Sequence, residues 1–257
     1  MSHATAIASL AHSVIELRQY TLHPGQRDTL IDLFDREFVE SQEALGMRIV
    51  GQFRDLDHPD RFVWHPDRFV WLRSFVDMPA RAEGLNGFYF GTVWQAHRAA
   101  ANATMIDSDN VLLLRPLWPG AGFQVDDTAR PGPGATGAGP GLIVIEVRYL
   151  KPDVHAAQIE ALARRLQPVL TGLGGAVSAW LTTESAPNNF PRLPVREGEP
   201  VLVSVMRFPG RSEYDLYRVN LQNAPSFKVL TDEMKALEAR PSEVLRLAPT
   251  ARSRLHG

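Results

Sequence analysis

The sequence contains no cysteine, which excludes several kinds of site at once. Disulfide bonds, zinc–thiolate sites, thiolate-ligated haem, iron–sulfur clusters and cysteine nucleophiles all need a thiol. The chain also lacks an excess of either charge, since 27 Lys and Arg stand against 29 Asp and Glu, for a formal net charge of -2. Because a basic surface is needed to hold a phosphate backbone, nucleic acid is not an expected partner.

Long hydrophobic runs are missing as well. No apolar stretch approaches the roughly 18 to 20 residues that a membrane-spanning helix needs. The first residues, 1–13, lack the basic region of a secretory signal. We therefore expect a cytoplasmic protein that does not contact a membrane. With 44% hydrophobic and 22% charged residues, the 257-residue chain is otherwise typical of a folded globular protein.

A segment rich in Gly, Pro and Ala divides the chain. Residues 119–141 hold few large apolar side chains that could offset the entropy of ordering them, which indicates a linker. The flanking parts resemble each other: VIELR at 14–18 corresponds to VIEVR at 144–148, and VLLLRP at 111–116 corresponds to VLRLAP at 244–249. We therefore predict an internal repeat, with a tail at 1–13, one domain at 14–118 and a second domain at 142–250.

Each half is predicted to contain the elements β-α-β-β-α-β. Alternating apolar residues indicate strands, and apolar residues at four-residue steps, such as Leu30, Phe34 and Phe38, indicate helices. The expected first-half elements are strand 14–20, a helix after Pro24, strands 47–54 and 69–75, helix 80–102 and strand 110–117. The expected second-half elements are strand 142–149, helix 154–171, strands 175–183 and 200–208, helix 212–238 and strand 243–248.

The predicted fold is α+β, with two ferredoxin-like domains whose sheets meet face to face as an intrachain dimeric α/β barrel. Because one chain supplies both sheets, it can act as a monomer. Exposed sheet edges would still allow a homodimer.

The space between the two sheets is the predicted pocket. Since side chains at i and i+2 share a face of a strand, we expect Ile15 and Leu17 under the helices and Glu16 toward the other sheet. By the same alternation, the expected ligand-binding residues are Arg18, Tyr20, Trp71, Arg73, Glu146 and Arg148. Such aromatic and guanidinium groups suit a planar or anionic small molecule. Alternatively, the Glu–Arg pairs only neutralise each other within a filled interface between the sheets.

Residues 58–64, HPDRFVW, are repeated unchanged as residues 65–71, which indicates an in-frame duplication in the first hairpin. The second copy continues directly into the predicted strand, so the first copy is expected to lengthen a loop at one mouth of the barrel. Either the insertion is tolerated at a modest entropic cost, or Trp64 and Arg61 reshape the ligand pocket for a new compound, such as a toxic one or an antibiotic.

Two stretches, VIELRQYTLHPGQRDTLIDLF and GFYFGTVWQAHRAAANATMIDSDNVLLLRPL, resemble the NIPSNAP family. The resemblance covers most of 14–118 and, more weakly, 142–250. It implies membership of the dimeric α+β barrel superfamily. It implies no single reaction, because that superfamily includes cofactor-independent monooxygenases, haem enzymes, isomerases and binding proteins.

The second of these stretches has the densest group of polar and aromatic side chains, namely Tyr89, Trp94, His97, Arg98, Asn102 and Asp107. On a helix most of them fall near one face, and His97 would serve as a general base if Glu16 or Asp107 oriented it. Against this, a helix of this architecture normally covers the outside of the sheet. Glu16 is the second candidate for proton transfer.

Motifs for metal or cofactor binding are missing. No HExxH, GxSxG, phosphate-loop or dinucleotide pattern occurs, and the eight histidines form no recognised set of ligand spacings. We therefore expect neither a metal nor a cofactor. Haem held by a single axial histidine is the alternative that the sequence leaves.

Two hypotheses for function result. The first is an enzyme or a sequestering protein for a small organic molecule, with Arg18, Trp71 and Arg73 for binding and Glu16 or His97 for proton transfer. The second is a non-catalytic protein-interaction scaffold with filled sheets. An enclosed cavity and stabilisation by a small ligand would favour the first hypothesis, and capture of a protein partner would favour the second.

Overall fold

The computed structural model describes residues 12–57, 67–124 and 130–257. The first copy of HPDRFVW, with Arg61 and Trp64, lies outside these ranges, so its effect on the pocket stays a prediction. No helix in the three ranges is both long enough and apolar enough to cross a membrane.

The first half follows the predicted order with two additions. Its elements are β1 Val14–Leu22, α1 Arg27–Leu33, a π-helical turn Phe34–Phe38, α2 Val39–Glu43, β2 Arg48–Asp55, β3 Asp67–Phe75, α3 Met78–Tyr89, α4 Thr92–Asn102, β4 Met105–Asp107 and β5 Val111–Pro116. The single helix predicted over 80–102 is two helices, because the chain is extended at Gly91. A Cβ there would lie 2.5 Å from the carbonyl oxygen of Gly87, so this break needs glycine.

The second half repeats the pattern. Its elements are β6 Leu142–Leu150, α5 Ala156–Gly172, β7 Ala176–Thr183, β8 Val201–Phe208, α6 Arg211–Gln222, α7 Pro225–Leu237 and β9 Glu238–Pro249. The helix predicted over 212–238 is again two helices. The second of them begins at Pro225, and the residue before a proline is disfavoured in helical conformation, so Ala224 is extended.

Eight of the nine described strands close into an antiparallel barrel, in the order β3-β2-β9-β6-β8-β7-β5-β1, with β1 paired back to β3. The short β4 pairs with the end of β1 outside this ring. The halves join where β2 pairs with β9 and where β5 pairs with β7. The sheet edges expected to be open for a homodimer are therefore paired within the chain.

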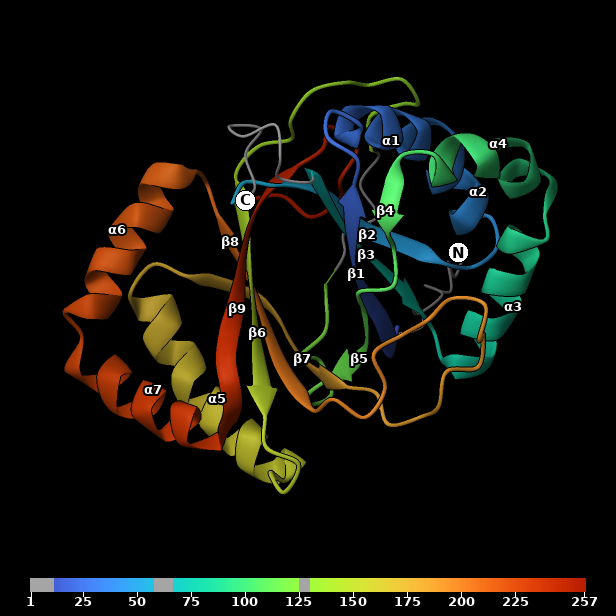
Figure 1. Cartoon of the computed structure of the whole chain (residues 1–257). Coiled ribbons are helices and arrows are strands. Elements are labelled where there is room, and N and C mark those ends of the chain that lie inside the picture. The colour runs from blue at the N-terminus through green and yellow to red at the C-terminus, as the bar shows by residue number, and fades with distance from the viewer. Residues whose placement is uncertain (1–11, 58–66, 125–129) are drawn as a thin grey trace, which may run out of the picture.

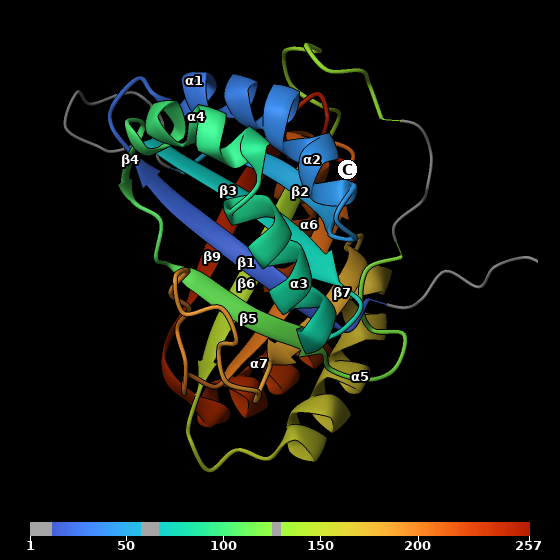
Figure 2. The ribbon, with the colours of Figure 1, turned by 90° about the vertical axis from the view of Figure 1, so that its right-hand side faces the viewer.

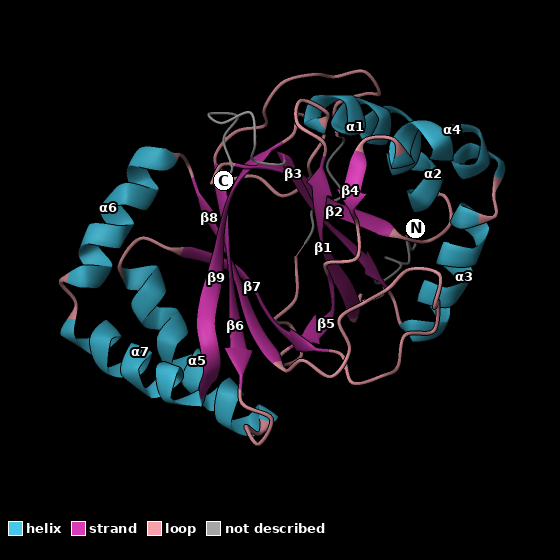
Figure 3. Cartoon of the chain, viewed as in Figure 1, coloured by secondary structure: helices cyan, strands magenta, loops and turns pink. Residues whose placement is uncertain are grey.

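Helices cover the barrel on two opposite sides (Figure 1 and Figure 3). Helices α5, α6 and α7 lie against the strands of the second half, and α1 to α4 lie across those of the first half (Figure 2). The fold is thus the closed α+β barrel that the repeat predicts, built from a single chain.

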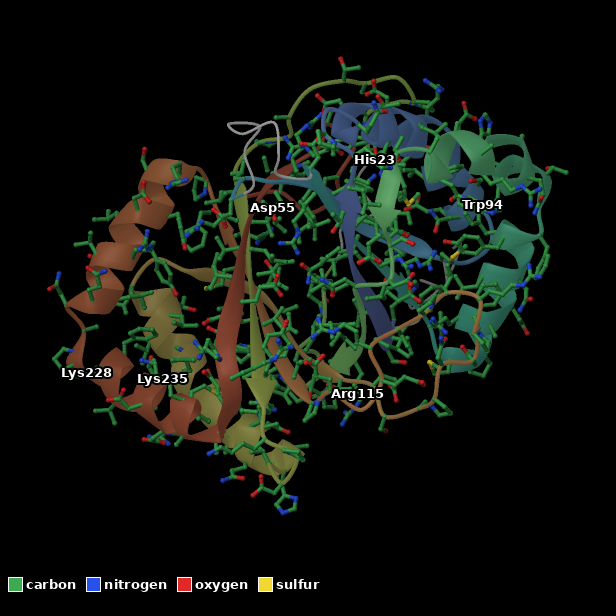
Figure 4. The ribbon with its side chains drawn as sticks, in the orientation of Figure 1. His23, Asp55, Trp94, Arg115, Lys228 and Lys235 are labelled. Carbon is green, nitrogen blue, oxygen red and sulfur yellow. The ribbon has the colours of Figure 1, made fainter. Side chains whose placement is uncertain are left out.

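The barrel interior is filled by aliphatic side chains from both halves, and side chains occupy the region between the two sets of strands (Figure 4). An interior of eight strands is just wide enough for side chains to fill. Ile15 and Leu17 belong to this core, whereas Tyr20 and Trp71 belong to a second core under the helices. The expected orientation of β1 was therefore wrong. The alternation itself is as predicted, but both faces of the strand are buried, and a period of two does not distinguish inside from outside.

Candidate functional site

The centre of the first-half site is the carboxylate of Glu16, which is fully buried on the helix-covered face of β1. Its Oε2 accepts hydrogen bonds from Arg18 Nη1 at 2.9 Å and from Arg73 Nε at 2.7 Å. Its Oε1 accepts one from Arg81 Nε, also at 2.7 Å. The register of β1 and β3 places Glu16 opposite Arg73, and α3 contributes Arg81. One carboxylate therefore organises three guanidinium groups.

The charges of this cluster do not balance. Arg18, Arg73 and Arg81 are as completely buried as Glu16, so three cations surround one anion. The Nη2 atom of each arginine is buried and has no hydrogen-bond partner among the described residues. An unpaired buried polar group costs about 1–3 kcal/mol, and more if it is charged, so such groups normally have partners. The cluster is consequently suited to a further anionic or polar group.

The protonation states in the cluster are fixed by its charges. Burial alone would raise the pKa of the Glu16 carboxyl, but Arg73, Arg18 and Arg81 together hold it well below its ordinary value of 4.5. Burial raises the pKa of the Tyr20 phenol, whose oxygen accepts a hydrogen bond from Arg18 Nε at 3.0 Å. Glu16 is therefore an ionised and weak proton acceptor, and Tyr20 is neutral.

Aromatic side chains form the wall beside the arginines. The guanidinium carbon of Arg73 lies 5.0 Å from the ring centroid of Trp71, and that of Arg18 lies 5.6 Å from it. The indole Nε1 of Trp71 is buried without a described hydrogen-bond partner. On the far side of this wall from the arginines, which do not line it, is a cavity of about 20 Å³, lined by Tyr20, Leu30, Phe34, Phe38, Gln42, Trp71, Phe88, Tyr89, Trp94 and Met105. This volume holds about one water molecule.

A loop of the second half closes over this site. The segment 184–200 connects β7 to β8 and reaches across to α3 (Figure 1). Arg81 Nη1 donates to Asn188 Oδ1 at 3.1 Å and to Asn189 Oδ1 at 2.7 Å. The ring of Phe190 packs 5.8 Å from that of Tyr89, measured between centroids. The second half thus contributes directly to the site of the first half.

The structure brings most of the predicted first-half residues together. Glu16, Arg18, Tyr20, Trp71 and Arg73 form one cluster with direct contacts. This cluster lies between the sheet and the helices, so the predicted location between the two sheets was wrong. The physical reason is the aliphatic filling of the barrel, which leaves the longer polar and aromatic side chains on the outer face.

His97 does not belong to the cluster. It lies on α4 with 33% of its side chain exposed, and its Nε2 is 3.5 Å from Glu37 Oε2. Neither Glu16 nor Asp107 orients it, because the ion partner is Glu37 and Asp107 is exposed on β4. Of its neighbours on α4, Trp94 lines the cavity and Arg98 is exposed.

The corresponding pair of the second half forms a different set of contacts. Arg148 Nη2 lies 2.7 Å from Glu146 Oε1, and Arg148 Nη1 lies 2.5 Å from Glu238 Oε1. These side chains also face helices rather than the first-half sheet, which corrects the expected orientation of β6. Both halves therefore hold a Glu–Arg pair, with an excess of guanidinium in the first and of carboxylate in the second.

Sequence reasoning missed four polar residues of the first-half site. Gln42, whose Oε1 accepts from Arg73 Nη1 at 2.8 Å, is the next four-residue step after Phe38 on the predicted apolar face. Arg81 shares a helix face with the buried Leu85. Helical spacing could therefore have indicated both Gln42 and Arg81. No sequence pattern marks Asn188 and Asn189, since they lie in the second half and contact Arg81 of the first half.

In the three described ranges, no group of three or more histidine or carboxylate side chains is arranged to hold a metal ion.

No family model and no curated protein matches the chain. Solved structures do match it over nearly its whole length. One is a proposed monooxygenase from Lactobacillus acidophilus, with 13% identity and a TM-score of 0.54 over 95% of this chain and 97% of that one. Another is an anthrone oxidase-like protein, with 15% identity and a TM-score of 0.55 over 96% and 97% of the two chains.

A NIPSNAP family protein from Agrobacterium tumefaciens matches a smaller part, 48% of this chain and 93% of its own, with 16% identity and a TM-score of 0.35. The full-length similarities show that the chain has the dimeric α+β barrel fold, with both halves on one polypeptide. At such low identity they show the fold alone.

Proposed function

We propose that this protein binds a small organic acid in the first-half site, between the sheet and helices α1 to α4. The observation that carries the proposal is the buried cluster of Arg18, Arg73 and Arg81 around the single carboxylate of Glu16. Each arginine leaves its Nη2 atom unpaired among the described residues. A carboxylate or phenolate would supply the missing acceptors and reduce the excess positive charge.

The surrounding walls support an aromatic acid. Trp71 and Tyr20 already pack edge to face, with centroids 5.9 Å apart, and Trp71 keeps an unpaired indole donor. Two full-length structural neighbours are described as a proposed monooxygenase and an anthrone oxidase-like protein, which fits a small organic ligand on this fold. An aromatic ring would stack within these walls and present its acidic group to the arginines.

The cavity has to enlarge before such a ligand can bind. At about 20 Å³ it holds one water, so an aromatic acid must displace side chains. Trp94 on α4 and Met105 on β4 line it and are only partly buried, which makes them the side chains that can move outward. We therefore expect binding to be accompanied by a rearrangement of α4 and β4.

Glu16 is assigned to organising the arginines rather than to proton transfer. Its pKa is held far below neutrality by the three guanidinium groups, and it already accepts a hydrogen bond from each. His97 pairs with Glu37, which is not part of this cluster. Sequestration of an acid needs no proton acceptor. The filled space between the sheets agrees with the scaffold hypothesis. The cavities between the strands and the helices support the ligand hypothesis instead.

We also propose how the chain is divided into repeats. We assign 14–118 and 142–250 as two ferredoxin-like, NIPSNAP-like repeats joined by the linker 119–141. The matching strand orders, β2-β3-β1-β5 and β7-β8-β6-β9, support this assignment. Cytoplasmic location and the oligomeric state, a monomer or a homodimer, remain predictions.

The test uses isothermal titration calorimetry of the full chain with benzoate, and with benzyl alcohol as the uncharged comparator. We expect benzoate to bind and to raise the thermal midpoint, because a ligand selective for the folded state stabilises it. Arg81→Met should abolish this binding, whereas Arg98→Met, at an exposed site on α4, should not. Equal binding of benzoate and benzyl alcohol, or an unchanged affinity in Arg81→Met, would contradict the proposal.

A further inference from the structure

The second half contains its own cavity, of about 160 Å³, between its strands and helices α5, α6 and α7. It is lined by Val144, Glu146, Arg148, Leu166, Leu170, Trp180, Ser204, Met206, Tyr214, Tyr217, Arg218, Leu221, Phe227 and Val244. An apolar cavity of about 150 Å³ accommodates a benzene ring. This one is therefore large enough for a single aromatic ring without the rearrangement that the first-half site requires.

The internal repeat explains why this cavity is open. In the first half, Glu16 on β1 is opposite Arg73 on β3. In the second half, Glu146 on β6 is opposite Ser204 on β8. Ser204 thus takes the position of Arg73, and a hydroxymethyl group replaces a guanidinium side chain. The volume that Arg73 fills in the first half is left free in the second.

The electrostatic character of the two sites is reversed. Arg148 is paired with both Glu146 and Glu238, so one buried guanidinium stands between two carboxylates. Arg218, the other cation of the lining, is exposed and lies 5.9 Å from the ring centroid of Tyr214. Glu238 is not part of the lining itself, so the buried group of Glu146, Arg148 and Glu238 carries one net negative charge, and Arg218 at the exposed side contributes one positive charge.

Glu146 keeps one oxygen available. Its Oε1 carries the contacts with Arg148 Nη2, at 2.7 Å, and with the Ser242 hydroxyl, at 3.3 Å. Its Oε2 makes no hydrogen bond to any described residue, and Glu146 is partly accessible at the cavity. The free oxygen is an acceptor for a donor group on a ligand.

We propose that this cavity is a second binding site and that it takes a compact aromatic amine. The ammonium group would bind the free oxygen of Glu146, and the ring would lie among Trp180, Tyr217 and Phe227. Carboxylate and aromatic faces both attract a cation, so the two features select the same ligand. The site is independent of the acid site proposed for the first half.

Benzylamine is the probe, titrated calorimetrically into the full chain at neutral pH, with benzyl alcohol and benzoate as comparators of the same ring. We expect benzylamine to bind at least about tenfold more tightly than benzyl alcohol, the size of effect typical of one charge-assisted hydrogen bond. Glu146→Gln should remove that difference. An equal affinity for the amine and the alcohol in the unaltered protein would overturn the assignment.

A second pair of variants tests the location without altering a buried charge. Val244 lines the cavity from β9 and is 38% exposed, so tryptophan can be introduced there and would block the opening. Val229 on α7 is 57% exposed and does not line the cavity, which makes Val229→Trp the matched control. Val244→Trp should abolish benzylamine binding and Val229→Trp should leave it unchanged. Benzylamine binding that survives Val244→Trp would place it elsewhere.

The two proposals can fail separately. Neither Arg81 nor its second-half partners Asn188 and Asn189 line the second-half cavity, so benzylamine should bind Arg81→Met as it binds the unaltered protein. Benzoate binding without benzylamine binding would overturn the second site alone. Benzylamine binding without benzoate binding would overturn the acid site alone.

Discussion

Arg81 and Asn189 are joined by a hydrogen bond of 2.7 Å that links the two halves of the barrel. The donor comes from α3 of the first half, and the acceptor comes from the loop between β7 and β8 of the second. The same Arg81 donates through Nε to Glu16. The second half therefore helps to position a cation in the site of the first, beyond completing the ring of strands.

Asn189→Ala should destabilise the protein by about 1–3 kcal/mol, because it withdraws an acceptor from a buried guanidinium. It also removes the bond from Asn189 Nδ2 to the Met78 carbonyl oxygen, at 2.6 Å. Urea unfolding measures the change. Asn223→Ala is the control, since the Asn223 side chain bonds only to its own helix at an exposed position. Equal destabilisation by the two variants would show that the contact between the halves contributes nothing specific.

The repeat offers a direct comparison of Glu16 and Glu146. Glu16→Gln leaves three buried guanidinium groups without an anion, and removing one partner of a buried ion pair typically costs about 3–5 kcal/mol. Glu146→Gln leaves Arg148 with Glu238, so a smaller loss is expected. Chemical unfolding at neutral pH of both variants tests this order. A larger loss of stability for Glu146→Gln would mean that the first-half cluster does not depend more strongly on its carboxylate than the second-half cluster does.

The pH dependence of stability follows from the same group. The folded-state pKa of Glu16 is lowered from 4.5, so its contribution is fully present above pH 4.5 and is lost as the pH falls through the folded pKa. Unfolding curves between neutral pH and strongly acidic pH should show a loss of stability below pH 4.5 that is absent in Glu16→Gln. A parallel loss in both proteins would assign the acid sensitivity to other carboxylates.

The sequence predicts the fold well because repetition and alternation are local signals. The order of strands follows from periodicity, and the closure of the barrel follows from finding that order twice. The orientation of Glu16 and Arg18 does not follow, since Ile15 and Leu17 are equally buried on the opposite face. Asn188 and Asn189 reach the site through tertiary contacts alone, so no local pattern marks them.

Asp35, in the π-helical turn, should make the protein less stable as the pH rises. Burial raises the pKa of its carboxyl from 3.8 to about 6, against the smaller lowering effects of neighbours such as Gln52 and Arg252. The stabilising effect of the bound proton is fully present below pH 3.8 and is lost as the pH rises through 6. Asp35→Asn keeps an oxygen for the bond from Gln52 Nε2, at 3.0 Å.

The variant Asp35→Asn should therefore be more stable than the unaltered protein at pH 8, by about 1–3 kcal/mol, and similar to it near pH 4. Urea unfolding at both pH values is the measurement, with Asp32→Asn, at an exposed position of α1, as control. A gain for Asp35→Asn that is the same at pH 4 and pH 8 would rule out titration of Asp35 as its cause.

Deleting residues 58–64 should leave the first-half site intact. The strand β3 begins at Asp67, and its site residues Trp71 and Arg73 belong to the retained second copy or follow it. Benzoate affinity and the urea midpoint should then match those of the full chain, because insertions in loops have a modest entropic cost. The comparison is a parallel titration of both proteins with benzoate and benzylamine. If the deletion weakens benzoate binding while leaving the urea midpoint unchanged, the duplicated segment with Arg61 and Trp64 contributes to ligand selection, and the adaptive interpretation replaces the neutral one.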